Sequence, residues 1–87
     1  MHGNSLDTDK PTVGYSLHEQ DTGEILKYGE TTRGSKRYTQ KYLDEHNAYY
    51  QKEVSGTKRE MHYWQHEKIL DYMYVADQRP PLNKSTW

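Results

Sequence analysis

"TVGYSLHEQDTGEILKYGE", residues 12–30, sets the fold of this chain, because its two halves alternate like strands and its centre suits a turn. In the first half, every second residue from Val13 to Leu17 is apolar, so one face of a strand can be buried. The central "QDTGE" supplies the aspartate and glycine of a chain reversal. We therefore expect an antiparallel hairpin of two strands, 12–19 and 24–30.

The rest of the chain predicts a helix, a third strand, a longer helix and a non-helical end. Residues 31–46, "TTRGSKRYTQKYLDEH", favour a helix that begins at Thr32 or Ser35, both good N-cap residues. Residues 47–54, "NAYYQKEV", are typical of a half-buried strand. The chain is therefore expected to be α+β, with a small three-stranded antiparallel sheet flanked by helices in the order strand, strand, helix, strand, helix.

Residues 58–76, "KREMHYWQHEKILDYMYVA", are the best-supported helix. Apolar side chains recur in it at helical spacing and predict a buried stripe. The members of that stripe are Met61, Trp64, Leu70 and Met73 or Tyr74. The prolines of residues 77–87 exclude a helix there, so this C-terminal segment is expected to lie back across the domain.

Length and composition limit what the chain can be. Its 87 residues suffice for one small domain, which we place at 12–87 after a polar leader or junction at 1–11. Cysteine is absent, so no disulfide or thiolate metal site is possible, and the 9 tyrosines must do much of the packing in place of phenylalanine. No apolar run is long enough for a membrane span, and no signal peptide is visible.

Charge is balanced overall but unevenly distributed. The net charge of −1 does not by itself indicate a nucleic-acid-binding protein. Four cationic residues nevertheless follow one another without an intervening acid, namely Arg33, Lys36, Arg37 and Lys41. Such a local patch can bind phosphates, although a solvated helix face has the same pattern.

The long helix carries one acid at an unexpected position. Glu67 falls three residues after Trp64 and three before Leu70, which places it on or beside the expected buried stripe. A buried carboxylate needs a metal ion or an arginine; alternatively, Glu67 lies at the edge of the stripe and reaches water. His62 and His66 have a spacing that can hold zinc, but no third ligand is evident, which favours surface or packing roles.

Several of these features resemble the GIY-YIG nucleases, a family with a small sheet flanked by helices and a tripeptide motif on each of its first two strands. "GYS", residues 14–16, resembles the first tripeptide, with Tyr15 as its tyrosine. "KYGET", residues 27–31, resembles the second. Arg37 lies eight residues after Gly29, which is the spacing of the family's arginine.

The second half of the chain extends the resemblance. Glu67 lies on the long helix, where the family keeps its metal-binding glutamate. "RPPLN", residues 79–83, is similar to the R-P-x-x-N ending of the excision-repair members, with Asn83 as the asparagine. The resemblance therefore implies an endonuclease, a hydrolase that acts on phosphodiester bonds.

The second tripeptide departs from the family pattern. When the motif is aligned on Gly29, Lys27 takes the place of its tyrosine and Tyr28 lies one position along, on the opposite face of the strand. Either Lys27 has the catalytic role or a bulge brings Tyr28 inward. Tyr42, about one turn past Arg37, stands where family members carry His or Tyr. Gly29 itself is expected to end the strand.

The resemblance also implies a mechanism. Glu67 would hold one divalent ion, Mg²⁺ or Mn²⁺, which polarises a phosphoryl oxygen. Tyr15 would deprotonate or orient a water, Arg37 would stabilise charge on the phosphate, and Asn83 would pin a strand or a phosphate. The residues expected to hold the flanking nucleic-acid backbone are Arg33, Lys36 and Lys41.

The spelling "LKYGETT…KRY" with "PPLNKS" is similar to short toxin domains at the C-terminal ends of bacterial polymorphic toxins, of the contact-dependent or Rhs type. That similarity implies secretion or delivery from a producer as part of a larger protein. It also implies action in the target-cell cytoplasm during bacterial competition, and a cognate immunity protein as partner. DNA is the favoured substrate; the alternatives are a tRNA-cleaving RNase of the same fold and a catalytically decayed module that binds nucleic acid or protein.

Overall fold

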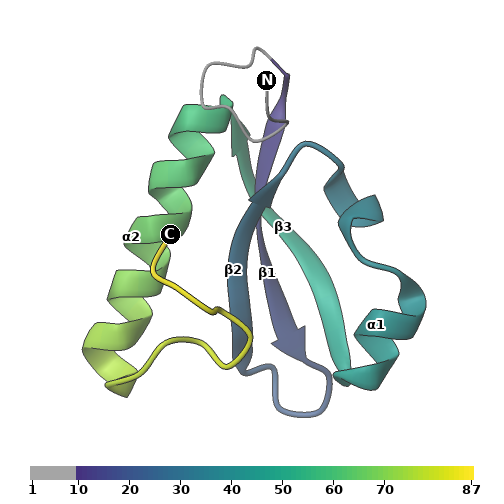
Figure 1. Cartoon of the computed structure of the whole chain (residues 1–87). Helices are drawn as coiled ribbons and strands as arrows, with labels where there is room; N and C mark the ends of the chain where they lie inside the picture. The colour runs from purple at the N-terminus through teal and green to yellow at the C-terminus, as the bar shows by residue number, and fades with distance from the viewer. Residues whose placement is uncertain (1–9) are drawn as a thin grey trace.

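The fold is α+β, as the sequence predicts: a three-stranded antiparallel sheet with helices on both of its sides (Figure 1). This computed structural model describes residues 10–87, so the expected leader at 1–11 lies outside the described residues except for Lys10 and Pro11. Along the chain the elements are β1 (Thr12–Glu19), β2 (Ile25–Thr31), the 3-10 helix η1 (Gly34–Arg37), α1 (Gln40–Glu45), β3 (Ala48–Gly56) and α2 (Lys58–Ala76).

The sheet order is β2-β1-β3, so β1 is central and β2 is an edge strand. β1 and β2 form the expected hairpin, and its turn contains Gly23 with a φ of +76°, which glycine adopts without steric cost. α2 covers one side of the sheet, while η1 and α1 lie on the other (Figure 1). The C-terminal segment returns to the edge strand, as expected, and the Leu82 N–H donates to the Leu26 carbonyl over 2.8 Å.

Alternation along β1 produces two packed layers. Tyr15 and Leu17 face the side of α1 and form the hydrophobic core with Tyr38. On the other face, Gly14 lies under Trp64 of α2, and a Cβ at this glycine would be only 2.6 Å from the indole Cε3. The absence of a side chain at Gly14 therefore lets the indole lie directly on the sheet.

Residues 31–46 do not form the single helix that the sequence predicts. Tyr38 is extended, with φ −120° and ψ 142°, and separates η1 from α1. Thr39 rather than Thr32 or Ser35 caps the α-helix, because its side chain accepts a backbone hydrogen bond from the first turn. The extended backbone turns the Tyr38 ring into the core, and tertiary packing outweighs local helix propensity here.

α2 has the predicted bounds, but its buried stripe differs from the predicted one. Met61 and Ile69 are buried, whereas Leu70 is 44% exposed and Tyr74 is 92% exposed. The reason is geometric, since Ile69 lies close to two full turns after Met61 and Leu70 is rotated out of that line. Neither α2 nor any other helix within residues 10–87 is long and apolar enough to cross a membrane.

Candidate active site

A pocket of about 620 Å³ lies at β2, the edge strand. Six of the seven predicted catalytic residues line it, namely Tyr15, Lys27, Tyr28, Arg37, Tyr42 and Asn83. They come from β1, β2, η1, α1 and the C-terminal segment. The fold thus brings to one pocket residues that are spread over most of the sequence.

Tyr15 forms the floor of the pocket, and Gly29 makes room for it. The two residues are cross-strand partners in the β1–β2 pair. A Cβ on Gly29 would overlap the hydroxyl end of the Tyr15 ring and would lie 2.9 Å from its Cε2. The expectation that Gly29 ends the strand is wrong, because β2 continues to Thr31; this glycine is required because the phenol crosses over it.

Tyr38 connects the polar groups of the pocket, and it was not among the predicted site residues. Its hydroxyl lies 2.7 Å from that of Tyr15, and its ring stacks on Tyr42 with centroids 4.9 Å apart. The Arg37 guanidinium carbon is 4.6 Å and the Lys27 ammonium 5.5 Å from the centroid of the same ring. Cation–π attraction therefore holds both cations at the pocket.

The buried position of Tyr15 determines its protonation. Burial, and after it the hydrogen bond with Tyr38, raises the pKa of the Tyr15 phenol far above its usual value. Burial likewise raises the pKa of Tyr42. Both phenols therefore keep their protons at neutral pH. Tyr15 is suited to donate or share a hydrogen bond, and it is a poor base for deprotonating water.

The register of the hairpin resolves the choice between Lys27 and Tyr28. Lys27 pairs with Leu17 and Tyr28 with Ser16, and the irregularity in this pair of strands lies beyond them, between Leu17 and His18. No bulge therefore brings Tyr28 inward. Lys27 therefore shares the face of Tyr15, and Tyr28 lies on the opposite face.

Tyr28 instead packs on the opposite face of the sheet and contributes its backbone to a tether. Its ring meets Trp64 edge to face, with centroids 5.9 Å apart. The Asn83 side chain accepts from the Tyr28 N–H and donates to the Tyr28 carbonyl, each over 2.9 Å. Asn83 therefore pins the C-terminal segment to β2.

Glu67 does not join the other six residues. It is exposed and does not line the pocket. It follows the buried Lys58 by nine residues, or about two and a half helical turns, so it lies on the opposite side of α2. Of the two alternatives for Glu67, the structure supports the one in which its carboxylate reaches water. From the same helix, Gln65 lines the pocket.

Glu30 is the acid that does line the pocket, and only one of its carboxylate oxygens is paired, because Oε2 is buried and has no hydrogen-bond partner within residues 10–87. Lys58 lies 2.6 Å from Glu30 Oε1, and both side chains are largely buried. Within residues 10–87, no three His, Asp or Glu side chains are grouped so as to hold a metal ion. Because Glu67 does not line the pocket, a Mg²⁺ or Mn²⁺ ion held by it would not lie among the cations and phenols that do.

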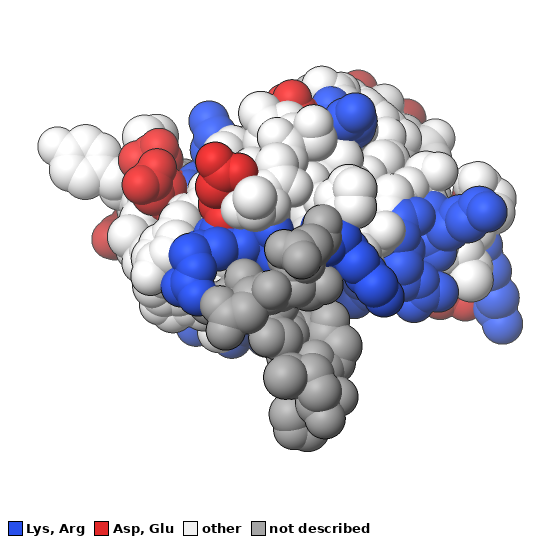
Figure 2. Space-filling view, turned by 90° about the horizontal axis from the view of Figure 1, so that it is seen from above, with Lys and Arg blue, Asp and Glu red and all other residues white. Residues whose placement is uncertain are grey.

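The remaining basic residues lie outside the pocket. Arg33, Lys36 and Lys41 are exposed and do not line it. Seen from above, basic side chains gather on the side of the molecule that carries η1 and α1 (Figure 2). This surface adjoins the pocket through Arg37, the last residue of η1, so it extends the positive charge beyond the pocket itself.

The packing interpretation of His62 and His66 is confirmed. Both rings stack on Trp87 of the C-terminal segment, with centroids 4.8 and 3.6 Å away. Trp87 and Lys84 line the pocket, and sequence reasoning had assigned neither a role. The aromatic and basic character of the last residues was the signal that could have found them.

Comparison with known proteins does not assign the chain to a group: no family model, no curated protein and no solved structure matches it. The function must therefore be argued from the pocket.

Proposed function

We propose that the chain is a nuclease that cleaves phosphodiester bonds in the pocket at β2 and acts as an antibacterial toxin domain; the family resemblance favours DNA as its substrate, whereas the composition of the pocket favours RNA. The observation that carries the proposal is the convergence of Lys27, Arg37 and the Tyr15–Tyr38 pair on one pocket. Two cations beside a neutral phenol suit an anionic ester. The toxin setting, with delivery into the cytoplasm of a competitor and a cognate immunity protein, comes from the family resemblance.

Each group in the pocket has a defined chemical task in this proposal. Arg37 and Lys27 bind the scissile phosphate and stabilise the negative charge that grows on its oxygens while the nucleophile, a water on DNA or the 2′-hydroxyl on RNA, attacks the phosphorus and displaces the leaving oxygen. The Tyr15 phenol, which retains its proton, donates a hydrogen bond to the same phosphate or to the leaving oxygen. Tyr38 supports it through the hydroxyl contact of 2.7 Å. No step is assigned to a metal ion on Glu67, because that carboxylate faces away from the pocket.

RNA is the second candidate substrate, and the composition of the pocket favours it. A nuclease that hydrolyses DNA must activate a water. The acid that lines the pocket, Glu30, is ion-paired with Lys58 through Oε1, and the Tyr15 phenol keeps its proton. RNA carries its own nucleophile, the 2′-hydroxyl, next to the scissile phosphate. A site of cations and phenols is therefore better matched to cleavage of RNA than to hydrolysis of DNA.

Arg37→Ala with Lys36→Ala as its matched control tests the pocket. The purified chain is incubated with supercoiled plasmid and with tRNA, and products are resolved on gels. We expect Arg37→Ala to lower the cleavage rate by on the order of a hundredfold. Lys36→Ala removes an equal charge outside the pocket and should change the rate by less than about threefold. Binding without cleavage of either substrate by the parent chain would instead indicate a binding module.

Glu67→Gln distinguishes two expectations for this residue, one from its position in the structure and one from the family resemblance. Because Glu67 lies on the outward side of α2, we expect cleavage by this variant to stay within about twofold of the parent. The family resemblance predicts that cleavage is abolished. Measured with and without Mg²⁺, a complete loss in Glu67→Gln would show that the acid acts in catalysis and that the pocket is assigned wrongly.

A further inference from the structure

Trp87 lines the pocket but has no task in the proposed cleavage chemistry. One face of its indole stacks on His66, with centroids 3.6 Å apart and ring planes 7° apart. Despite this contact, Trp87 remains 47% exposed. A large aromatic side chain thus keeps about half of its surface exposed at a pocket that Lys27, Arg37 and Lys84 also line.

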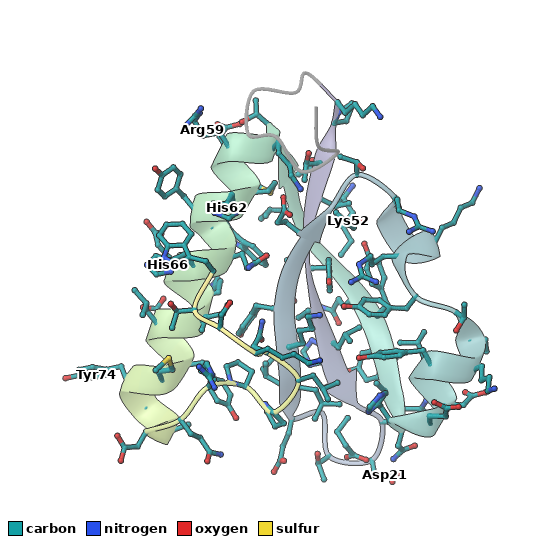
Figure 3. The ribbon with its side chains drawn as sticks, viewed as in Figure 1. Asp21, Lys52, Arg59, His62, His66 and Tyr74 are labelled. Atoms are coloured by element: carbon teal, nitrogen blue, oxygen red, sulfur yellow. The ribbon has the colours of Figure 1, made fainter. Side chains whose placement is uncertain are left out.

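The indole is held in place before any ligand arrives. His62 stacks on it at 4.8 Å, and Tyr63 meets it edge to face at 5.6 Å. His66 Nδ1 lies 2.6 Å from the Thr86 carbonyl, and because a carbonyl only accepts, the imidazole donates this bond. Figure 3 shows His62 and His66 on α2 beside the returning C-terminal segment. A ring held this way loses little conformational freedom when a second ring stacks on it.

Cations surround the same pocket as the indole. Lys27, Arg37 and Lys84 line it together with Trp87. Proteins that bind single-stranded nucleic acid combine a positive groove for the backbone with aromatic faces on which bases stack. In an intact duplex the bases stack on one another and cannot lie against a side chain in a pocket.

We propose that Trp87 is the stacking platform for an unpaired nucleobase, so that the pocket takes a single-stranded or flipped-out nucleotide rather than an intact duplex. The inference rests on the proposed function, since it places the scissile phosphate at Lys27 and Arg37. It adds the class of substrate: nucleic acid with an accessible base next to the bond that is cleaved.

Equilibrium binding tests the platform. A fluorescently labelled single-stranded oligonucleotide with phosphorothioate linkages, which resist cleavage, is titrated with the chain and followed by anisotropy; the same sequence is also presented as a duplex. We expect the single strand to bind about tenfold more tightly than the duplex. Trp87→Ala should weaken single-strand binding by roughly tenfold, in the range that one base–aromatic stack contributes, and leave duplex binding unchanged.

Two controls separate stacking from packing. Trp87→Phe keeps an aromatic face and should recover most of the affinity, whereas Trp87→Leu keeps apolar packing against His66 and should not. Tyr74→Ala removes an exposed aromatic ring that points away from the body of the protein (Figure 3) and should have no effect. Equal single-strand affinity of Trp87→Ala and the parent, within about twofold, overturns the proposal.

The cleavage assay keeps this inference distinct from the proposed function. If the parent cleaves but Trp87→Ala binds and cleaves single strands like the parent, the platform is wrong and the nuclease stands. If the parent cleaves nothing but its affinity for single strands depends on Trp87, the platform stands and the chain is a binding module.

Discussion

At the scale of single residues, the pocket depends on Gly29, because the lack of a side chain there leaves room for the Tyr15 ring. Tyr15 can cross to Tyr38 because its partner on β2 is Gly29. The backbone of Gly29 does not have a positive φ, so another residue could adopt its conformation. The requirement for glycine is therefore one of space, and it is set by a residue fourteen positions earlier in the chain.

Gly29→Ala tests this requirement. The added methyl group overlaps the Tyr15 phenol, so the ring must move and its bond to Tyr38 must break. We expect a loss of about 1–3 kcal/mol in the free energy of unfolding, measured with urea, and a loss of the proposed cleavage activity. In a Tyr15→Leu background the colliding atoms are absent, and the same substitution should cost much less. An equal cost in both backgrounds would contradict the assigned contact.

At the scale of elements, α2 is the part of the fold that the chain specifies most locally. Thr57 and Glu60 form a capping box: the Thr57 hydroxyl accepts from the Glu60 N–H over 3.0 Å, and the Glu60 carboxylate accepts from the Thr57 N–H over 2.9 Å. These two bonds satisfy donors that the first turn of a helix leaves free. They explain why the observed start of α2 agrees with the predicted one.

Thr57→Ala should therefore lower the free energy of unfolding by about 1 kcal/mol, the usual value for an N-cap. Thr32→Ala is the matched control, because Thr32 was a predicted cap and the structure gives it no α-helix to cap. Urea denaturation of both variants compares them directly. A larger effect at Thr32 than at Thr57 would mean that the capping assignment is wrong.

The capping box also predicts a pH dependence. Its hydrogen bonds from the Thr57 backbone and side chain lower the pKa of Glu60 from its ordinary value of 4.5. Because the pKa is lower in the folded state, this stabilisation is fully present above pH 4.5 and is lost as the pH falls through the folded pKa. The stability difference between the parent and Glu60→Gln, measured by urea denaturation, should therefore shrink in acid. A difference that stays constant from neutral pH into acid would count against this contribution.

At the scale of the whole molecule, the C-terminal segment completes both the sheet edge and the pocket. Asn83 tethers it to β2 by two hydrogen bonds, and Trp87 anchors its end on α2. Edge strands expose unpaired backbone groups, and here the Asn83 amide satisfies those of Tyr28. The segment therefore closes the molecule and brings Trp87 and Lys84 to the pocket.

Asn83→Ala should release this segment. Loss of two largely buried hydrogen bonds should lower the free energy of unfolding by about 2 kcal/mol. Amide exchange at Tyr28 should speed up with it, measured by hydrogen–deuterium exchange. Lys84→Ala, an exposed neighbour, is the control and should leave both quantities near those of the parent. Unchanged exchange at Tyr28 in Asn83→Ala would show that the segment is held by other contacts.

The sequence by itself determined the elements whose signals are local. Strand alternation predicted the bounds of β1, the Asp-Thr-Gly turn predicted the hairpin, and cap residues with helical spacing predicted α2. From these the α+β class follows, because their periodicities do not depend on distant residues. The order of motifs in the chain also singled out Tyr15, Lys27, Arg37, Tyr42 and Asn83, which the fold does gather at one pocket.

Only the tertiary structure decided which side chains face the core, the pocket or the solvent. Tyr38 leaves the helical conformation because its ring is buried against Tyr15, a contact between residues 23 positions apart. Glu67 turns outward because the rotation of α2 is set by the residues that it packs on the sheet, and spacing alone left that rotation open. Whether Lys27 or Tyr28 lies on the face of Tyr15 depends on the register of β2. Hydrogen bonding to β1 fixes that register, and the local sequence pattern does not.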